Sequence, residues 1–170
     1  MLLGWAAAEG WNPGLHDAEA FHAADPEGFL LGWLDDEPVA GISLVRYDPA
    51  WAFLGLYIVR PEHRGQGHGL AIWRAAMARA EGRSVGLDGV VAQQANYARS
   101  GFALVRRNVR YVGRAPLGEP GGGTAAGAGL LPAAEVAFDT LARLDRSAFP
   151  AERPAFLCAH GSGCPGTWAW

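Results

Sequence analysis

The feature that most constrains the fold is an apolar segment that leads into a glycine-rich loop and then into an amphipathic helix. Residues 51–59 (WAFLGLYIV) are apolar almost throughout, which is typical of a central strand covered on both faces. The loop at residues 60–69 (RPEHRGQGHG) has glycine at positions 65, 67 and 69. Beyond it, apolar side chains recur at helical spacing on one predicted face: Leu70, Trp73, Met77 and Ala80. Strand, loop and helix in this order indicate an α/β fold.

Hydrophobic periodicity and turn signals predict the elements around this unit. Helices are expected at 2–9, 17–24, 93–100 and 138–148, and strands at 28–34, 39–47, 84–91 and 102–112. Two helices, three strands and then alternating helix and strand predict a mixed sheet, an α/β fold of the α+β type.

Composition excludes several classes of partner. The chain has 170 residues and a formal net charge of −3, and all 14 of its basic residues are arginine. A slightly acidic chain without a basic run does not favour nucleic acid, and no apolar stretch is long enough for a membrane span. The two cysteines, Cys158 and Cys164, give no disulfide framework, so we expect a cytoplasmic protein.

The glycine loop predicts an anion site. Glycines at the start of a helix let backbone N–H groups approach an anion, and the helix dipole adds partial positive charge. The neighbouring side chains supply further cationic character, from Arg60, His63, Arg64 and His68. This favours a phosphate or pyrophosphate site, although a simple connecting turn remains the alternative for a lone motif of this kind.

Two other nucleotide-binding motifs fit less well. A P-loop requires lysine, which this chain lacks. The dinucleotide fingerprint G-x-G-x-x-G has a different glycine spacing, although Asp88 lies about 20 residues downstream, where a ribose ligand is expected. Dinucleotide binding therefore remains the weaker alternative.

The loop fits the R/Q-x-x-G-x-G/A signature of the GNAT N-acetyltransferase superfamily through Arg64, Gly67 and Gly69. Residues 97–102 (YARSGF) resemble the Tyr-x-x-x-Gly-Phe step of the same superfamily. Over residues 1–113 the sequence therefore resembles a GNAT domain. Residues 10–14 and 86–90 are similar to a bacterial subfamily with two tandem GNAT domains. The resemblance implies a GNAT-like acyl-CoA N-acyltransferase fold. The family normally begins with a strand, whereas this sequence is predicted to open with a helix, so we expect either a truncated start or a missing edge strand.

The resemblance also implies a domain organisation. Residues 1–113 would form the GNAT domain, and the Gly-, Ala- and Pro-rich residues 114–129 a flexible linker. Residues 130–170 resemble the incomplete start of a second GNAT-like domain. Because about forty residues do not readily build a core alone, we expect this segment to be flexible or to be one helix lying loosely on the first domain.

The activity that the resemblance implies is direct attack of a small-molecule amine on acetyl-CoA, with no metal. Cys158, His160 and Cys164 fall short of a four-ligand zinc pattern. Tyr97 would be the general acid, although packing at a helix end would also explain it. The cofactor-binding residues would be Ile58, Val59, Arg64, Gly65, Gln66, Gly67, His68, Gly69 and Leu70.

The base, the acceptor and the oligomeric state stay open. Residues 51–59 contain no carboxylate, and Glu62 is expected to face solvent beside the loop. Asp88 or a water relay is left to accept the proton of the amine. The acceptor pocket is expected around residues 10–25, and a homodimer is one alternative for the assembly. The competing function is a non-catalytic acyl-CoA-binding sensor or scaffold.

Overall fold

The structure is a computed structural model that describes residues 1–14, 16–109, 111, 113–114, 131–132 and 135–159. Its helices and strands, in chain order, are α1 (Leu2–Ala8), α2 (Asp17–Ala24), β1 (Phe29–Leu34), β2 (Glu37–Arg46), β3 (Trp51–Val59), η1 (Pro61–His63), α3 (His68–Ala78), β4 (Ser84–Leu87), η2 (Val91–Gln93), α4 (Gln94–Arg99), α5 (Phe138–Ala148) and α6 (Pro154–Ala159).

The chain divides into two compact units. One consists of Met1–Asp88 with Ala133–Trp170, and the other of Gly89–Pro132. These boundaries differ from the predicted division into residues 1–113 and 130–170. The predicted linker at 114–129 lies, apart from residue 114, outside the described residues.

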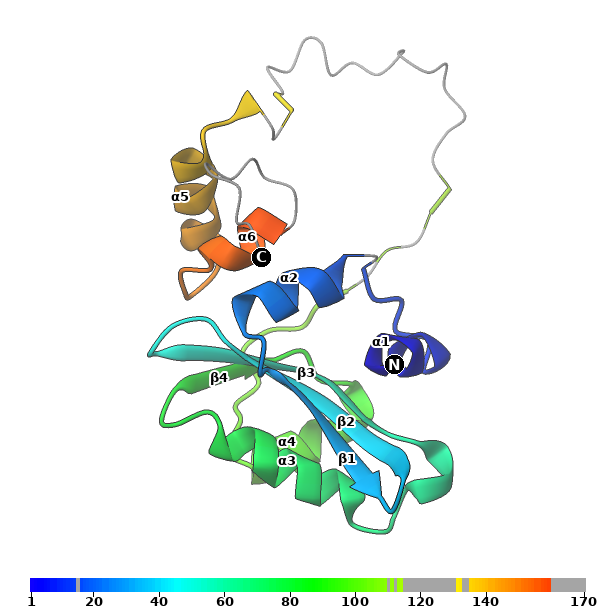
Figure 1. Cartoon of the computed structure of the whole chain (residues 1–170). Helices are drawn as coiled ribbons and strands as arrows, with labels where there is room; N and C mark the ends of the chain where they lie inside the picture. The colour runs from blue at the N-terminus through cyan, green and yellow to red at the C-terminus, as the bar shows by residue number, and fades with distance from the viewer. Residues whose placement is uncertain (15, 110, 112, 115–130, 133–134, 160–170) are drawn as a thin grey trace. The chain divides into compact units, whose positions relative to one another are not determined.

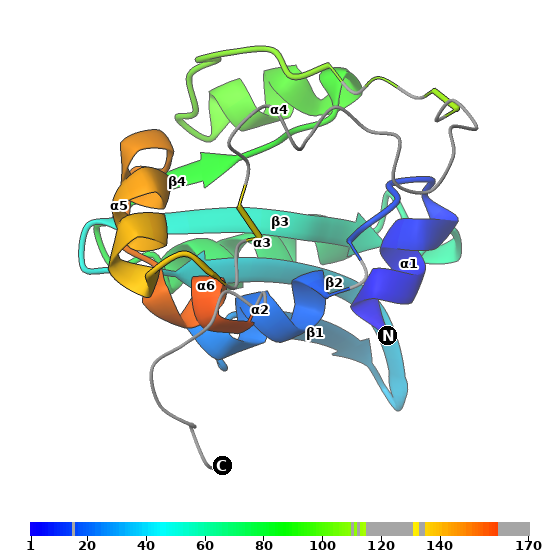
Figure 2. The same cartoon turned by 90° about the horizontal axis from the view of Figure 1, so that it is seen from above.

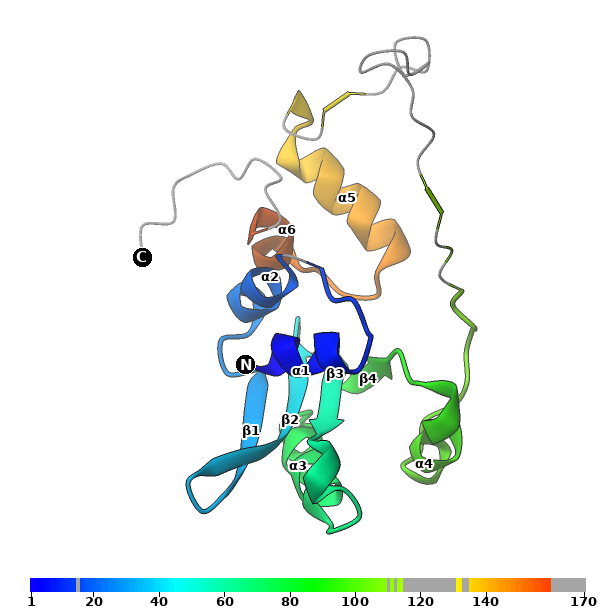
Figure 3. The ribbon, with the colours of Figure 1, turned by 90° about the vertical axis from the view of Figure 1, so that its right-hand side faces the viewer.

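The first unit is built on a mixed sheet with the strand order β1-β2-β3-β4. β1, β2 and β3 pair in antiparallel fashion, and β3 pairs with β4 in parallel, which confirms the predicted fold class. Figures 1 and 3 show α1 and α2 on one face of the sheet and α3 on the other. Both faces of the middle of the sheet are therefore covered, and Val39, Ile42 and Leu44 are the largest fully buried side chains.

Most predicted elements are confirmed, but several details are wrong. α2 and β3 have the predicted bounds. Leu70, predicted to face the core, is 53% exposed, and Ile72 is buried in its place. β4 ends at Leu87 instead of continuing to residue 91.

The predicted strand at 102–112 is also wrong for its described residues. Residues 102–109 have no regular secondary structure, and Leu104, Val105 and Val109 are exposed. The apolar residues at 102–105 favour a strand, but a strand also needs a hydrogen-bonded neighbour. None of the four described strands pairs with this segment.

The C-terminal segment packs on the sheet-containing unit. α5 confirms the predicted helix, whereas α6 was not predicted. The ring of Phe156 on α6 lies 5.3 Å from Phe21 on α2, and Phe149 makes an edge contact with Tyr47 at 5.1 Å. The guanidinium of Arg153 lies 3.8 Å from the centre of the Phe149 ring. The expectation of a loosely attached segment is therefore wrong for residues 138–159.

An ion-pair network joins the end of α2 to the sheet and to α3. The carboxylate of Asp25, only 5% exposed, accepts hydrogen bonds from the backbone N–H (3.1 Å) and Nε (2.9 Å) of Arg46. Arg79 lies 3.6 Å away on the other carboxylate oxygen. Glu27, at the surface, approaches the same two arginines. Asp25 is thus the buried anion that compensates two cationic side chains.

None of the helices within the described parts of the chain combines the length and the apolar character needed to cross a bilayer.

Candidate functional site

The end of β3 departs from regular pairing. Gly41 of β2 pairs with Ile58 of β3, and Ser43 of β2 pairs with Gly55 of β3. Two residues of β3, Leu56 and Tyr57, therefore oppose the single residue that separates Gly41 from Ser43 on β2. This is a β-bulge, and Leu56 adopts a positive φ of 48° within it. Bulges are over-represented next to active sites because they redirect the strand. The sequence gives no local sign of this bulge beyond Gly55, because its position depends on the register with β2.

The second departure is on the other edge of β3. β4 pairs only with Trp51 to Leu54, and Figure 2 shows β4 alongside only the first part of β3. Residues 55–59 of β3 therefore have no β4 partner. The backbone N–H of Arg60 donates to Val39 of β2 (3.0 Å), and successive residues alternate in direction. Hence the N–H of Val59 points toward the open edge, while that of Ile58 points toward β2.

The loop after β3 contains two glycines whose backbone conformation requires them. Gly65 has a φ of 75° and Gly67 has a φ of 91°, in the left-handed region that other residues adopt only with strain. A Cβ atom at either position would have no neighbour within 4 Å. The requirement is therefore conformational and not steric, and it leaves the loop backbone uncovered.

The first turn of α3 presents unpaired N–H groups. Gly67 is its N-cap and no side chain caps the helix. The first helical hydrogen bond runs from the N–H of Ala71 to the carbonyl of Gly67 (3.1 Å), so the N–H groups of His68, Gly69 and Leu70 precede it and have no partner within the helix. The first turn also carries no acidic residue. These amides and the helix dipole favour an anion at this end of α3.

Gly69 has a different role from Gly65 and Gly67. A Cβ atom at Gly69 would lie 2.8 Å from the Tyr57 hydroxyl and 3.2 Å from Val59 Cγ2. Glycine thus lets α3 approach β3 closely, which brings the first turn of the helix to the bulged end of the strand. The glycines of the loop are therefore explained by two separate physical requirements.

We expect Gly69→Ala to lower the free energy of unfolding by about 1–3 kcal/mol, because the methyl group overpacks this contact. Urea denaturation of the full chain measures the effect. The double variant Gly69→Ala/Tyr57→Phe should regain part of the loss, because it removes the hydroxyl that the methyl group meets. Equal destabilisation in both variants would contradict this explanation.

The side chain of Arg64 stabilises the conformation of the loop. Its Nε donates to the carbonyl of Val59 (2.9 Å), and a terminal nitrogen contacts the carboxylate of Glu9, just after α1. Gln66 donates from Nε2 to the carbonyl of Glu62 (3.1 Å). The side chains of Arg64 and Gln66 thus shape the loop, and the loop backbone faces outward. Sequence reasoning missed Glu9 because it lies 55 residues away from Arg64.

The other cationic residues of the loop are largely neutralised. The guanidinium of Arg60 contacts the carboxylates of Glu37 and Glu62. His63 also approaches Glu37 at 3.8 Å. The ligand atoms of Glu37, Glu62 and His63 lie within 4.8 Å of one another. Because Arg60 already supplies the positive charge between these carboxylates, the cluster is explained without a metal ion.

Glu62, beside the loop, is a poor candidate for the base. A hydrogen bond from its own backbone N–H holds the pKa of Glu62 below its usual range, and Arg60 lowers it further. A lowered pKa makes the carboxylate a weaker base. Asp88 directly follows β4 and is the last residue of the first segment of the sheet-containing unit.

Tyr97 lies in the second unit, on α4. The N–H of Phe102 donates to the carbonyl of Tyr97 (3.1 Å) and that of Gly101 to Ala98 (3.0 Å), and Gly101 has a φ of 89°. These bonds form a Schellman C-cap, which explains the Tyr-x-x-x-Gly-Phe spacing physically. Burial raises the pKa of the Tyr97 phenol, which therefore stays protonated at neutral pH.

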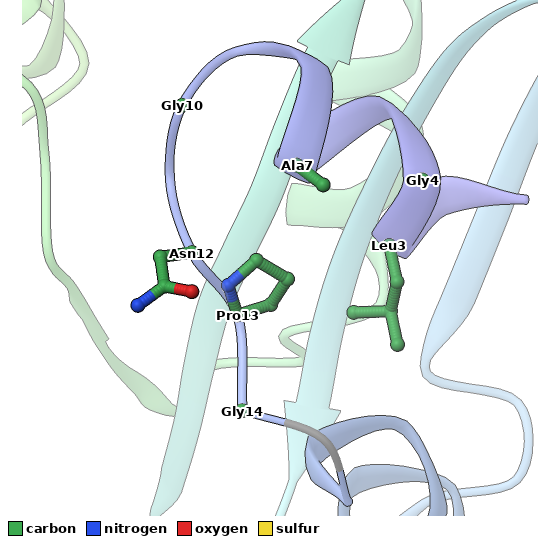
Figure 4. A pocket seen from close by; sticks show the side chains of 7 residues that line it. All are labelled: Leu3, Gly4, Ala7, Gly10, Asn12, Pro13 and Gly14. Atoms are coloured by element: carbon green, nitrogen blue, oxygen red, sulfur yellow. The ribbon is translucent and has the colours of Figure 1, made fainter.

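A shallow pocket lies beside α1. Its lining residues are Leu3, Gly4, Ala7, Gly10, Asn12, Pro13 and Gly14, and Figure 4 shows the apolar atoms of Leu3, Ala7 and Pro13 around one space. Asn12 contributes the one polar side chain of the seven. The opposite side of α1 packs through Leu2 and Ala6 against Ile58. The pocket therefore coincides with part of the predicted acceptor region and is carried by a helix that rests on β3.

The comparisons with known proteins agree with this geometry. The chain matches the acetyltransferase (GNAT) family over residues 2–103. It belongs to the GNAT family. Over 109 residues the chain is 46% identical to the holothin acyltransferase of Pseudoalteromonas sp. (strain SANK 73390), in an alignment that covers 64% of this chain and 37% of that protein. The chain thus spans little more than a third of the length of this relative.

Solved structures support the GNAT fold. A proposed acetyltransferase from Pyrococcus horikoshii superposes with a TM-score of 0.63 at 21% identity, over 87% of this chain and 52% of that chain. A Staphylococcus aureus protein of unknown function superposes with a TM-score of 0.51 at 16% identity, over 66% of this chain and 90% of that chain. At these identities the similarity shows the fold alone.

Proposed function

We propose that the chain transfers an acetyl group from acetyl-CoA to the primary amine of a small molecule by direct attack. The observation that carries the proposal is the juxtaposition of the uncapped first turn of α3 with the unpaired edge of β3. The first offers amides to a diphosphate, and the second offers an extended backbone to the amide-containing arm of the cofactor. Membership of the acetyltransferase family supports the same reaction.

Each predicted cofactor residue has a part in this proposal. The backbone N–H groups of the loop and first turn hold the diphosphate, from Gly65, Gln66, Gly67, His68, Gly69 and Leu70. Arg64 keeps the loop in shape. Val59 offers its N–H to the thioester oxygen, where a donor stabilises the tetrahedral oxyanion. Ile58 contributes through its packing under α1, because its side chain is buried there.

The test is direct binding followed by turnover. Isothermal titration calorimetry with acetyl-CoA, a longer acyl-CoA and NADH should show binding of acetyl-CoA and none of NADH. An amine panel that includes holothin, named for the relative of this chain, should then yield an acetylated product. Binding without turnover of any amine would favour the acyl-CoA sensor or scaffold. Absence of acyl-CoA binding would overturn both.

We expect Tyr97→Phe to lower kcat about 100-fold, since positioned acids contribute on this scale, while the Kd of acetyl-CoA stays within about twofold. Because burial raises the pKa of Tyr97, the phenol is protonated at neutral pH and has its proton available for the departing sulfur. Steady-state kinetics and calorimetry measure the two quantities. An unchanged kcat with chemistry rate-limiting would reduce Tyr97 to its role in the C-cap of α4.

The partners follow from the same proposal. It requires a small-molecule amine and acetyl-CoA and no metal, nucleic acid or membrane. Cytoplasmic localisation and a homodimer remain predictions, for which fractionation of cells and light scattering of the purified chain are the measurements.

A further inference from the structure

Glu9 lies at the end of α1, on the side of the helix that faces the sheet. Its backbone N–H still donates to a carbonyl of the helix (3.0 Å), so the helical geometry extends to this residue. Leu2 and Ala6 of α1 are buried against β3, and Glu9 follows them by seven and three positions, which places it on the same helical face. From there its carboxylate contacts the guanidinium of Arg64.

This contact ties the glycine loop to a distant element. The other side-chain hydrogen bonds of Arg64 and Gln66 go to carbonyls at positions 59 and 62, next to the loop in the chain. Among the residues that the structure describes, Glu9 is the one hydrogen-bonding or ion-pairing partner of residues 64–67 that lies outside positions 59–71. Without it, the loop would be held only by its own neighbours.

The loop has a particular need for such a contact. Glycine loses more conformational freedom on ordering than any other residue, and two of the four residues at 64–67 are glycines with positive φ, Gly65 and Gly67. A loop that is already ordered in the free protein binds its ligand more tightly, because the cost of ordering does not reduce the affinity.

We propose that Glu9 is a positioning residue of the cofactor site: its carboxylate holds Arg64 at the end of β3 and so orders the diphosphate loop before acetyl-CoA binds. This inference rests on the proposed function of the loop. Simple electrostatics acts in the opposite direction, because a carboxylate near a bound diphosphate repels it. The two effects are therefore separated by comparing variants of equal charge.

Glu9→Gln and Glu9→Met provide this comparison. Both remove the charge, and both introduce an unbranched side chain with good helix propensity. Only glutamine keeps an oxygen that accepts a hydrogen bond from Arg64. In calorimetry the Kd of acetyl-CoA should be about fivefold higher for Glu9→Met than for Glu9→Gln, the scale of one hydrogen bond. As a control, Glu19→Gln and Glu19→Met change a carboxylate on α2 that is 76% exposed, and their Kd values should be equal.

Two further measurements separate positioning from a general effect on α1. In an Arg64→Ala background, Glu9→Gln and Glu9→Met should bind acetyl-CoA equally, because the partner of residue 9 is absent. In the free protein, trypsin can cleave after Arg64 only when this side chain leaves its contacts. Cleavage there should be about fivefold faster in Glu9→Met than in Glu9→Gln. Thermal denaturation shows whether each variant is folded, and Glu9→Ala replaces Glu9→Met if the latter is not.

The outcomes separate this inference from the proposed function. If the wild-type chain does not bind acetyl-CoA, the proposed function fails, and the trypsin comparison still decides whether Glu9 orders the loop. If the chain binds acetyl-CoA but the two Glu9 variants have equal Kd values or equal cleavage rates, the positioning role is wrong while the cofactor site stands. A difference in Kd that persists without Arg64 would also overturn it.

Discussion

Gly67→Asp should weaken acetyl-CoA binding about 100-fold relative to Gly67→Asn. Gly67 caps α3 at a φ of 91°, where asparagine and aspartate are the residues that best tolerate a positive φ. The two variants have nearly the same shape and the same backbone strain. They differ by one negative charge beside the proposed diphosphate, and a like charge about 5 Å away costs roughly 3 kcal/mol in a partly exposed site.

Calorimetric titration of both variants with acetyl-CoA measures the ratio of their Kd values. Nothing lies within 4 Å of a Cβ atom at this position, and the two side chains have nearly the same volume, so sterics do not distinguish the variants. Comparable affinities for the two variants would show that no anion binds at the start of α3. A parallel titration in added salt should narrow the difference, because screening weakens the repulsion.

Asp25→Asn should lower the free energy of unfolding by about 3 kcal/mol, because it leaves Arg46 and Arg79 without their buried counter-ion. The matched control is Glu27→Gln. Glu27 approaches the same two arginines but is 74% exposed, so its loss should cost less than about 1 kcal/mol. Urea denaturation of the full chain compares the two, and equal losses would contradict the role assigned to burial.

The same carboxylate predicts a dependence of stability on pH. Burial alone would raise the pKa of Asp25, but the hydrogen bonds and positive charge of Arg46, with Arg79, outweigh burial and lower it. The folded state therefore holds the Asp25 proton less tightly than the unfolded chain does. The resulting stabilisation is complete above the unfolded pKa of about 4 and is lost as the pH falls through the lowered value. In Asp25→Asn, the free energy of unfolding should therefore depend less on pH in the acid range, as denaturation curves at several pH values would measure.

Local sequence patterns predict the elements whose formation depends on nearby residues. The apolar run of β3 and the glycine loop after it specify strand, turn and helix within about 30 residues of chain. The motif predicts that the loop needs its glycines, but it does not predict which physical requirement each glycine meets. Only the structure distinguishes the positive φ of Gly65 and Gly67 from the close packing of Gly69 against Tyr57.

Features that depend on distant partners could not be predicted in this way. The bulge at Leu56 depends on the register with β2, and the contact between Glu9 and Arg64 joins residues far apart in the chain. The error at residues 102–109 has the same origin, because an apolar run can favour a strand but does not supply the neighbouring strand that it needs. The roles of Tyr97 and of the cofactor residues stay predictions.

The packing of α6 on α2 has a consequence for how the chain folds during synthesis. Phe21 and Tyr47 leave the ribosome long before Phe149 and Phe156, the rings that they contact. Until residue 156 emerges, the outer side of α2 lacks its apolar cover, and closure of so long a loop slows folding. A fragment that stops at residue 113 would retain the four strands β1–β4. It would leave the apolar side of α2 exposed, because it lacks the α6 residues that cover it.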